Sequence, residues 1–366
     1  MSKAAELAKI GEVATNSQIG GRRNIIINGA MQVAQRGTSV TGIGAANGYF
    51  TVDRFKLFQA GTAGRLTMSQ AAITDLGGFS NAMKFDVTTA DASIAAGELF
   101  QIGTMFEGQD IQGFKKGHSD AEGFTVSFYV KGTAKTYSVE LFDGDNTRHV
   151  TQTFNVTTSW NRIVLNFPAD TTGKFDSDNA LSLYILIWVH AGSTYTGGTA
   201  ATSWAANNNA NRAVGCGSLF SSTDNELFIT GLQMEVGSQA TPFEHRSFGE
   251  ELALCQRYFT ELSIPTNESF THISTGIMGV YNSATQGLLR YFFPVQMRAV
   301  PTLSFDALSS FDIEPFDVAP SAIASGSGTT KALALEVTDP SSRTKGFAFM
   351  LTVDTATGYI RFDSEL

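Results

Sequence analysis

The chain has 366 residues and a formal net charge of −9, and only 16% of its residues are charged. A hydrophobic share of 42% is enough for packed cores and excludes a disordered chain, and the length predicts two or three domains. Because an acidic chain gains nothing from counterion release, we do not expect it to bind nucleic acid. No segment reaches the roughly 18 continuous apolar residues of a membrane span, so membrane insertion is not expected.

The N-terminal segment combines a short helix with a hinge. In residues 2–14, Leu7 and Ile10 belong to an apolar stripe that alternates with charged residues, which predicts a helix. A helix this short is marginal alone, so we expect it to pack against another protein or against copies of itself; a frayed terminal helix is the alternative. Residues 15–23 predict a hinge, and the segment before it lacks the apolar core of a Sec-type signal peptide.

A series of short strands predicts that residues 23–246 form an antiparallel, jelly-roll-like β-sandwich. Turns recur about every 8–14 residues with hardly any helix between the strands, which is typical of a sandwich rather than of a parallel βαβ sheet. The clearest alternation lies in FTVSFYVKG, where every second residue from Phe124 to Val130 is apolar. The β segments predicted here are 24–37, 49–59, 83–88, 98–108, 124–132, 136–146, 148–156, 159–167, 181–191 and 225–237.

The pattern changes near Ser247, where a capped helix is predicted. Ser247 and Glu250 fit a capping box, and apolar residues then recur on one helical face. Strands resume after this helix, except in the Ser/Gly-rich segment 321–331, which predicts a flexible loop. The mainly β chain is therefore divided into an anchoring helix and hinge (1–22), the sandwich (23–246), and a linking helix with a smaller C-terminal β domain (247–366).

The stretch before this helix is expected to join the two β domains. Its phenylalanines would be packing anchors, and its charged residues would pair locally or with a neighbouring subunit. The predicted joint residues are Phe243, His245, Arg246, Phe248 and Glu250.

Motifs for nucleotide binding and catalysis are broken or missing. A GxGxxG fingerprint would need glycine at position 47 after Gly42 and Gly44, but Asn47 is there. HExxH, EF-hand and GxSxG patterns are absent. We therefore predict no catalytic residue, no cofactor and no enzyme.

The histidines and the acidic turns are the candidate metal ligands of the sequence. No two of the five histidines lie closer than about 30 positions, so no metal is predicted. His149 and His190 are candidates for pairing across strands, although a structural role is favoured for each. Acidic turns could hold calcium, but Asp and Asn are also good turn formers, and that interpretation is favoured. These turns contain Asp143, Asp145 and Asn146 in one case and Asp176 and Asp178 in the other.

A Gly/Thr/Asn-rich segment, residues 191–212, predicts a loop with candidate sugar contacts. The face of an exposed aromatic ring matches the CH face of a pyranose, and planar amides can add hydrogen bonds. The favoured interpretation is that the aromatic residues anchor the loop and the asparagines form a solvated turn. The four candidates are Tyr195, Trp204, Asn207 and Asn208. Trp160 and Trp188 lie in strand patterns and are predicted to be core residues.

Four segments resemble a group of bacteriophage tail fibre or tail-associated virion proteins of marine and environmental phages. They are GRRNIIINGAMQVAQRGTS with YFTVDRF, FEGQDIQGFKKGHSDAEGFTVSFYVKG, DGDNTRHVTQTF, and GLQMEVGSQATPFEHRSFGEELALCQRYF. The region between NIIINGAM and ITGLQMEVG also resembles a carbohydrate-binding jelly roll, in which the first and last strands close the sandwich.

The resemblance implies a virion component of the phage tail, assembled in the host cytoplasm. Its expected partners are other tail proteins, further copies of itself in a homotrimer, and host surface polysaccharide. Leu7 and Ile10 would then make the virion or oligomer contacts. The expected function is that of a tail fibre or receptor-binding protein. The alternatives are a structural tail adaptor, collar or capsid decoration protein, and a polysaccharide depolymerase.

Overall fold

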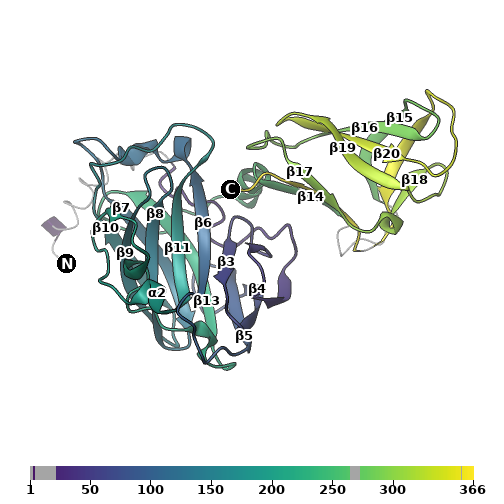
Figure 1. Ribbon diagram of the computed structural model, residues 1–366. Helices are drawn as coiled ribbons and strands as arrows, with labels where there is room; N and C mark the ends of the chain where they lie inside the picture. Colours follow the sequence, from purple (N-terminus) through teal and green to yellow (C-terminus); the bar gives the residue numbers. More distant parts are fainter. Residues whose placement is uncertain (1–2, 5–21, 264–272, 356) are drawn as a thin grey trace. The chain divides into compact units, whose positions relative to one another are not determined.

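The computed structural model describes residues 3–4, 22–263, 273–355 and 357–366 (Figure 1). The chain forms two compact units, Met1–Glu251 with Leu366, and Leu252–Glu365. The first is an antiparallel β-sandwich and the second is a smaller β domain, which confirms the predicted fold class. None of the helices in the described ranges is long and apolar enough to cross a membrane. Leu7 and Ile10, and with them the expected virion and oligomer contacts, lie outside the described residues.

The sandwich of the first unit consists of two antiparallel sheets. The six-stranded sheet has the order β1 (Ser39–Ile43), β4 (Arg65–Ala72), β5 (Asn81–Thr89), β13 (Glu226–Val236), β7 (Phe124–Gly132) and β10 (Asn161–Phe167). The seven-stranded sheet has the order β12 (Ala205–Ala206), β9 (Arg148–Val156), β8 (Lys135–Asp143), β11 (Leu181–Ala191), β6 (Leu99–Glu107), β3 (Lys56–Ala60) and β2 (Gly48–Tyr49). Short helical turns η1 (Gly108–Asp110), η2 (Gln112–Phe114), α2 (Ser193–Thr196), η3 (Asn209–Asn211) and η4 (Leu219–Ser221) lie in the loops.

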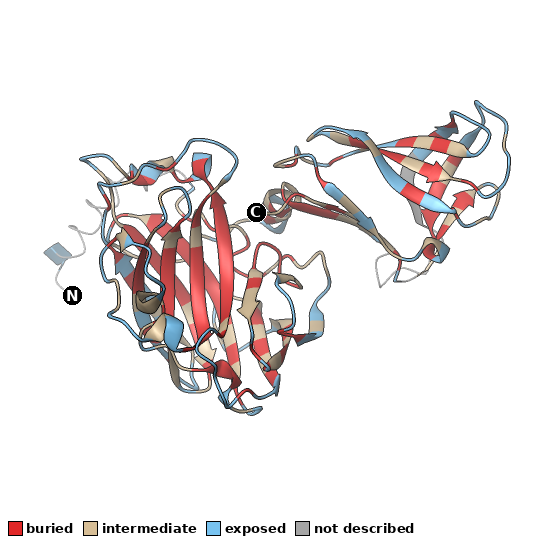
Figure 2. Ribbon diagram, viewed as in Figure 1, coloured by how far each residue is buried: buried red, intermediate tan, exposed pale blue. Residues whose placement is uncertain are grey.

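The core lies between the two sheets because every second side chain of a strand points inward. In β7, the predicted inward residues Phe124, Val126 and Phe128 are all fully buried. Tyr137 and Leu141 of β8 belong to the same core cluster. Each buried side chain of this size contributes about 2–3 kcal/mol to folding. Figure 2 shows buried residues running along the strands.

The first segment of the sandwich runs beside the closing strand β13 but is not a regular strand, which corrects the expected β segment 24–37. The Ile25 N–H donates to the Met234 carbonyl at 3.2 Å. Asn28 then adopts φ 61°, a left-handed conformation that ends extended structure. The buried Asn28 amide donates to the carbonyls of Val33 and Asp53 at 2.8 and 3.0 Å, which holds the turn in place.

The helix α3 (Phe248–Gln256) is capped as predicted, since the Ser247 hydroxyl accepts a hydrogen bond from the Glu250 N–H at 3.3 Å. Arg246 donates to the Ile26 carbonyl at 3.0 Å, to the Asn24 carbonyl, and to Glu251 at 3.2 Å. The stretch before α3 is therefore bonded to the first segment of its own unit. The sequence did not point to Glu251, which also accepts from the Asn28 N–H at 2.5 Å.

The other joint residues have different surroundings within the first unit. Phe243 and His245 pack against Phe79, with ring centroids 5.1 and 5.3 Å away. Phe248, expected as a packing anchor, is 57% exposed. Glu250 lies 4.0 Å from Arg22 in an exposed pair, which adds little stability.

The second unit contains a three-stranded and a six-stranded sheet. The three-stranded sheet has the order β14 (Phe259–Ser263), β22 (Tyr359–Asp363) and β17 (Thr302–Phe305). The six-stranded sheet has the order β18 (Phe311–Glu314), β21 (Ala348–Val353), β15 (Ile273–Tyr281), β16 (Gln286–Phe292), β20 (Ala332–Thr338) and β19 (Ala322–Gly328). The turn η5 (Leu308–Ser310) precedes β18. The expected flexible loop 321–331 is largely strand β19, because a Ser/Gly-rich segment needs only backbone hydrogen bonds to β20 to become an edge strand.

We predict that Asn28→Ala lowers the free energy of unfolding of the sandwich by about 2–3 kcal/mol, because it removes buried hydrogen bonds and leaves alanine at a positive φ. Denaturant unfolding of the full chain measures this change. The exposed Asn207→Ala is the matched control and is expected to change stability by less than about 0.5 kcal/mol. Equal stability of the two variants would contradict the role of the turn.

Candidate functional site

A row of aromatic rings crosses the face of the seven-stranded sheet that points away from the core. Phe58 of β3, Tyr184 of β11 and Phe142 of β8 are all half-buried. Their neighbours along the strands, such as Leu57 and Ile185, belong to the core between the sheets. The three rings pack instead against a separate cluster on the outer face. We call Phe58, Tyr184 and Phe142 the aromatic row.

Strand register sets the spacing of the aromatic row. Tyr184 is directly opposite Phe142 on the neighbouring strand, and their ring centroids lie 5.7 Å apart. The Phe58 ring follows at 6.4 Å from Tyr184. Between them, Gly103 of β6 leaves room, because a Cβ there would come within 2.7 Å of the Phe58 ring. A glycine therefore lets the rings approach one another across an intervening strand.

Glu140 lies fully buried beside the aromatic row on β8. Its carboxylate accepts hydrogen bonds from Trp188 Nε1 at 2.8 Å and from Arg212 Nε and Nη2 at 2.8 and 3.1 Å, and it contacts His149 Nδ1 at 3.0 Å. Burial acts to raise the pKa of Glu140, but His149, Arg212 and Trp188 outweigh it and hold the pKa below its ordinary value. The carboxylate is therefore ionised at neutral pH.

Cations flank the aromatic row at both ends. The Arg212 guanidinium lies 5.1 Å from the ring centroids of both Phe142 and Trp188. The Lys56 ammonium lies 5.3 Å from the Phe58 centroid and 5.4 Å from that of Tyr49. Such cation–π contacts orient the charged groups beside the rings. The face therefore combines apolar rings with hydrogen-bond donors at its edges.

Of the four sugar contacts predicted in the loop, only Tyr195 reaches this face. Its ring packs against Trp188 at 5.1 Å, at the edge of the outer cluster. Trp204 is only 9% exposed, donates from Nε1 to the Pro168 carbonyl at 2.9 Å, and belongs to the core cluster. The Asn207 N–H donates to the Thr147 carbonyl, and the Asn208 side chain caps η3, with both residues exposed. A sugar-binding role for these four residues stays a prediction.

The row itself was missed by the sequence analysis, although a signal existed. The predicted strands 136–146 and 181–191 each carry apolar residues at two successive positions, so one set had to point away from the core. The prediction that both remaining tryptophans are core residues is correct for Trp188, which is fully buried. It is wrong for Trp160, which is half-buried and donates to Asp75 at 2.9 Å.

The two buried histidines have separate partners, so the alternative that they pair with each other is wrong. His149 contacts Glu140, whereas His190 Nδ1 lies 2.8 Å from the Ser218 hydroxyl and its Nε2 lies 3.4 Å from Glu98. The two histidines lie on different strands, and each meets the carboxylate that its own register brings near. In the described part of the chain, one group, Asp91, Glu98 and His190, has its ligand atoms close enough together to hold a metal ion.

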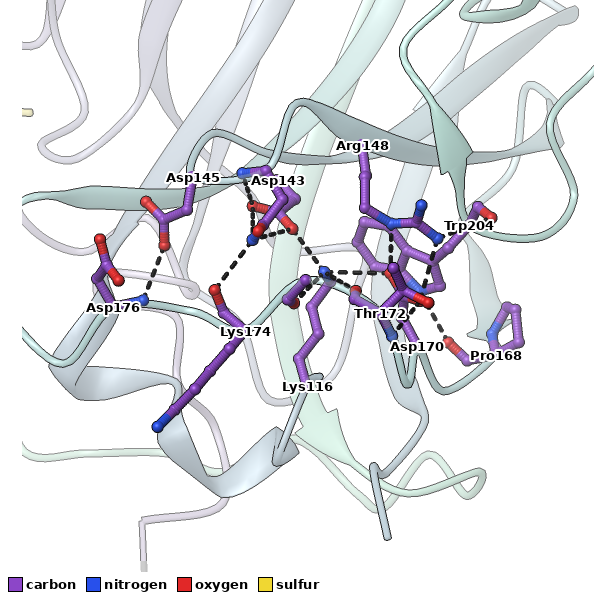
Figure 3. A network of polar contacts seen from close by, with 12 residues as sticks. Lys116, Asp143, Asp145, Arg148, Pro168, Asp170, Thr172, Lys174, Asp176 and Trp204 are labelled. Carbon is purple, nitrogen blue, oxygen red and sulfur yellow. Dashed lines mark hydrogen bonds and ion pairs between the residues drawn. The ribbon is translucent and has the colours of Figure 1, made fainter. Parts of the chain in front are cut away.

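The first acidic turn is held by a lysine (Figure 3). The fully buried Lys116 ammonium donates to Asp143 at 2.5 Å and to the carbonyls of Thr172 and Gly173 at 3.0 and 2.7 Å, and it lies 3.1 Å from Asp170. Its charge therefore occupies the place between these oxygens that a calcium ion would need. Burial acts to raise the pKa of Asp170, but hydrogen bonds from Arg148, Thr172 and Lys116 outweigh it and lower the pKa.

The remaining acidic residues are engaged in turns. Asp145 accepts from the Asp176 N–H at 3.0 Å, and Asp178 accepts from the Ala180 N–H at 2.9 Å. This is the turn-forming role that the sequence analysis favoured.

Comparison with known proteins gives distant structural neighbours. No protein-family model and no curated protein matches the chain. The enzymatically active domain of tailspike protein 4 of bacteriophage CBA120 is 10% identical over 58% of this chain and 21% of its own, with a TM-score of 0.32. This chain thus spans about a fifth of that protein.

Carbohydrate-binding modules are also among the neighbours. A CBM4 structure is 12% identical over 57% of this chain and 97% of its own, with a TM-score of 0.31. The family 11 module of cellulase Lic26A-Cel5E of Clostridium thermocellum is 11% identical over 55% and 100%, with a TM-score of 0.28. These scores are too low to carry an argument about function.

We predict that Lys116→Met lowers the free energy of unfolding by about 3–5 kcal/mol, because it leaves the buried Asp143 carboxylate without its cation and leaves Asp170 with Arg148 alone. The adjacent Lys115→Met is the matched control, since its side chain is 47% exposed, and it is expected to cost less than about 1 kcal/mol. Denaturant unfolding of both variants measures the difference. A stable Lys116→Met protein that binds calcium in its place would contradict this assignment.

We predict that Glu140→Gln destabilises the sandwich most at neutral pH. A depressed pKa contributes stability that is present above the ordinary value of 4.5 and is lost as pH falls through the lowered one. The difference in unfolding free energy between wild type and Glu140→Gln should therefore shrink as pH falls below 4.5. Glu226→Gln serves as the control, since the Glu226 side chain is 43% exposed. A difference that does not change with pH would contradict the ionised state of Glu140.

Proposed function

We propose that this chain is a non-catalytic, carbohydrate-binding attachment protein of a phage virion, and that the aromatic row binds polysaccharide on the host surface. The observation that carries the proposal is the row of half-buried rings on the outer face of the sheet, with Lys56 and Arg212 at its ends. A sheet face made only to be solvated would carry polar side chains there.

The chemistry of the row suits a sugar chain. Aromatic rings offer flat apolar area to the CH face of a pyranose, and they lose little conformational entropy on binding. Rings that succeed one another at 5.7 and 6.4 Å form a platform longer than one sugar ring. The Lys56 and Arg212 side chains would donate to hydroxyl or carboxylate groups of the ligand. The row therefore favours a chain of sugars, including acidic ones.

The surroundings of Glu140 support a non-catalytic role. A glycoside hydrolase needs two carboxyl groups placed on either side of the bond that is cleaved. Glu140 lies on the same strand as Phe142, and both of its oxygens are already engaged by Trp188, Arg212 and His149. The proposal that the chain acts in a virion rests on the resemblance of its four segments to phage tail proteins.

We predict that Tyr184→Ala and Phe142→Ala each weaken binding of the full chain to its polysaccharide at least tenfold, because each removes stacking area worth about 1.4 kcal/mol or more. An array of bacterial surface polysaccharides identifies the ligand, and calorimetry then measures its affinity for each variant.

Phe248→Ala is the matched control, since Phe248 is an exposed aromatic residue outside the row, and it should bind like wild type. Binding that is unchanged in Tyr184→Ala and Phe142→Ala would contradict the proposed face. Release of reducing ends from the polysaccharide would favour a depolymerase instead. Wild-type protein that binds no polysaccharide would favour a structural adaptor, collar or decoration protein.

A further inference from the structure

Two buried carboxylates and a buried imidazole meet where the chain crosses between the sheets of the sandwich. Asp91 follows β5 of the six-stranded sheet, and Glu98 immediately precedes β6 of the seven-stranded sheet. His190 lies on β11, which pairs with β6 so that His190 is opposite Phe100. Residues distant in sequence are thus brought together by strand register.

The three side chains are close and nearly inaccessible. Asp91, Glu98 and His190 are 5%, 8% and 0% exposed, and their ligand atoms all lie within 4.8 Å of one another. His190 Nε2 lies 3.4 Å from Glu98 Oε2. One Asp91 oxygen accepts from the Thr62 hydroxyl and the Ala63 N–H, both at 2.8 Å. These two donors are neutral, so they leave the charge of Asp91 uncompensated.

The two carboxylates of the cluster lack a cation to balance their buried charge. Neither His190 Nε2 nor Glu98 Oε2 makes a hydrogen bond within the described ranges, and no lysine or arginine described there pairs with Asp91 or Glu98. Buried negative charge without a cation is costly.

We propose that Asp91, Glu98 and His190 form a three-ligand site for one divalent transition-metal ion of the zinc class, whose fourth position a water would fill. Zinc binds imidazole nitrogen and carboxylate oxygen at about 2.0–2.2 Å, which places neighbouring ligands of a tetrahedron roughly 3.3–3.5 Å apart. The 3.4 Å between Nε2 and Oε2 matches this spacing. The dication would balance the two carboxylates.

The second nitrogen of His190 supports the same assignment. Its Nδ1 lies 2.8 Å from the Ser218 hydroxyl, an acceptor that would fix the tautomer with a free Nε2 lone pair facing Glu98. Metal-ligating histidines are commonly held by such a partner. The loop between β5 and β6 carries two of the ligands, and β11 carries the third. A bound ion would therefore connect this loop to β11 and link the two sheets.

The test uses the full chain, stripped with a chelator and then titrated with Zn²⁺ by calorimetry and followed by thermal unfolding. We expect about one ion per chain, a higher Tm with zinc, and weaker binding of Ca²⁺, which prefers oxygen ligands. His190→Gln and Glu98→Gln should each lower zinc affinity at least tenfold. The exposed His118→Gln is the matched control and should bind like wild type.

Ser218→Ala keeps all three ligands and tests the site even if a ligand variant does not fold. It should lower zinc affinity about tenfold, because it removes the hydroxyl that orients His190. Wild-type protein without saturable zinc binding near one ion per chain would overturn the proposal. Zinc affinity that is unchanged in Ser218→Ala, Glu98→Gln and His190→Gln would overturn it as well.

Discussion

Glu140 carries a fully buried negative charge on a strand of the seven-stranded sheet, and the outer face depends on how that charge is satisfied. A buried carboxylate is tolerated only when donors surround it, and here an indole and a bidentate guanidinium do so. The guanidinium belongs to Arg212, which lies beyond α2 in the chain, so the same contacts fasten this loop to the sheet. They also hold Arg212 against the Phe142 ring. One interior charge thus orders the edge of the aromatic row.

The same principle recurs at the network around Lys116. There the buried charge is positive, and Asp143, Asp170 and two backbone carbonyls of the loop after β10 surround it. Arg148 pairs with Asp170 and also donates to the Trp204 carbonyl, so the network holds the loop that carries Trp204. Long loops in a β-sandwich need such buried polar networks, because the loops bury too little apolar area to be ordered by hydrophobic packing alone.

Period-two alternation was enough to predict the sandwich, since strands such as β7 and β11 direct every second side chain into one core. The capped start of α3 was equally readable, because Ser247 and Glu250 are local neighbours. The aromatic row was not predicted, because it depends on strand register. Tyr184 lies opposite Phe142, and Glu140 contacts Arg212, only after the strands have paired. Trp204 packs in the core, as is expected if it anchors its loop, but a loop segment rich in small polar residues does not show which surface its tryptophan packs against.

The central claim is that the aromatic row is the surface that holds a sugar chain. The most direct measurement is a crystal structure of the full chain with an oligosaccharide cut from the polysaccharide that it binds. Sugar rings stacked on Tyr184 and Phe142, with Arg212 or Lys56 bonded to their polar groups, are the result this account predicts. A sugar bound to the loop around Asn207, or to the second unit, with the aromatic row left bare, would contradict it.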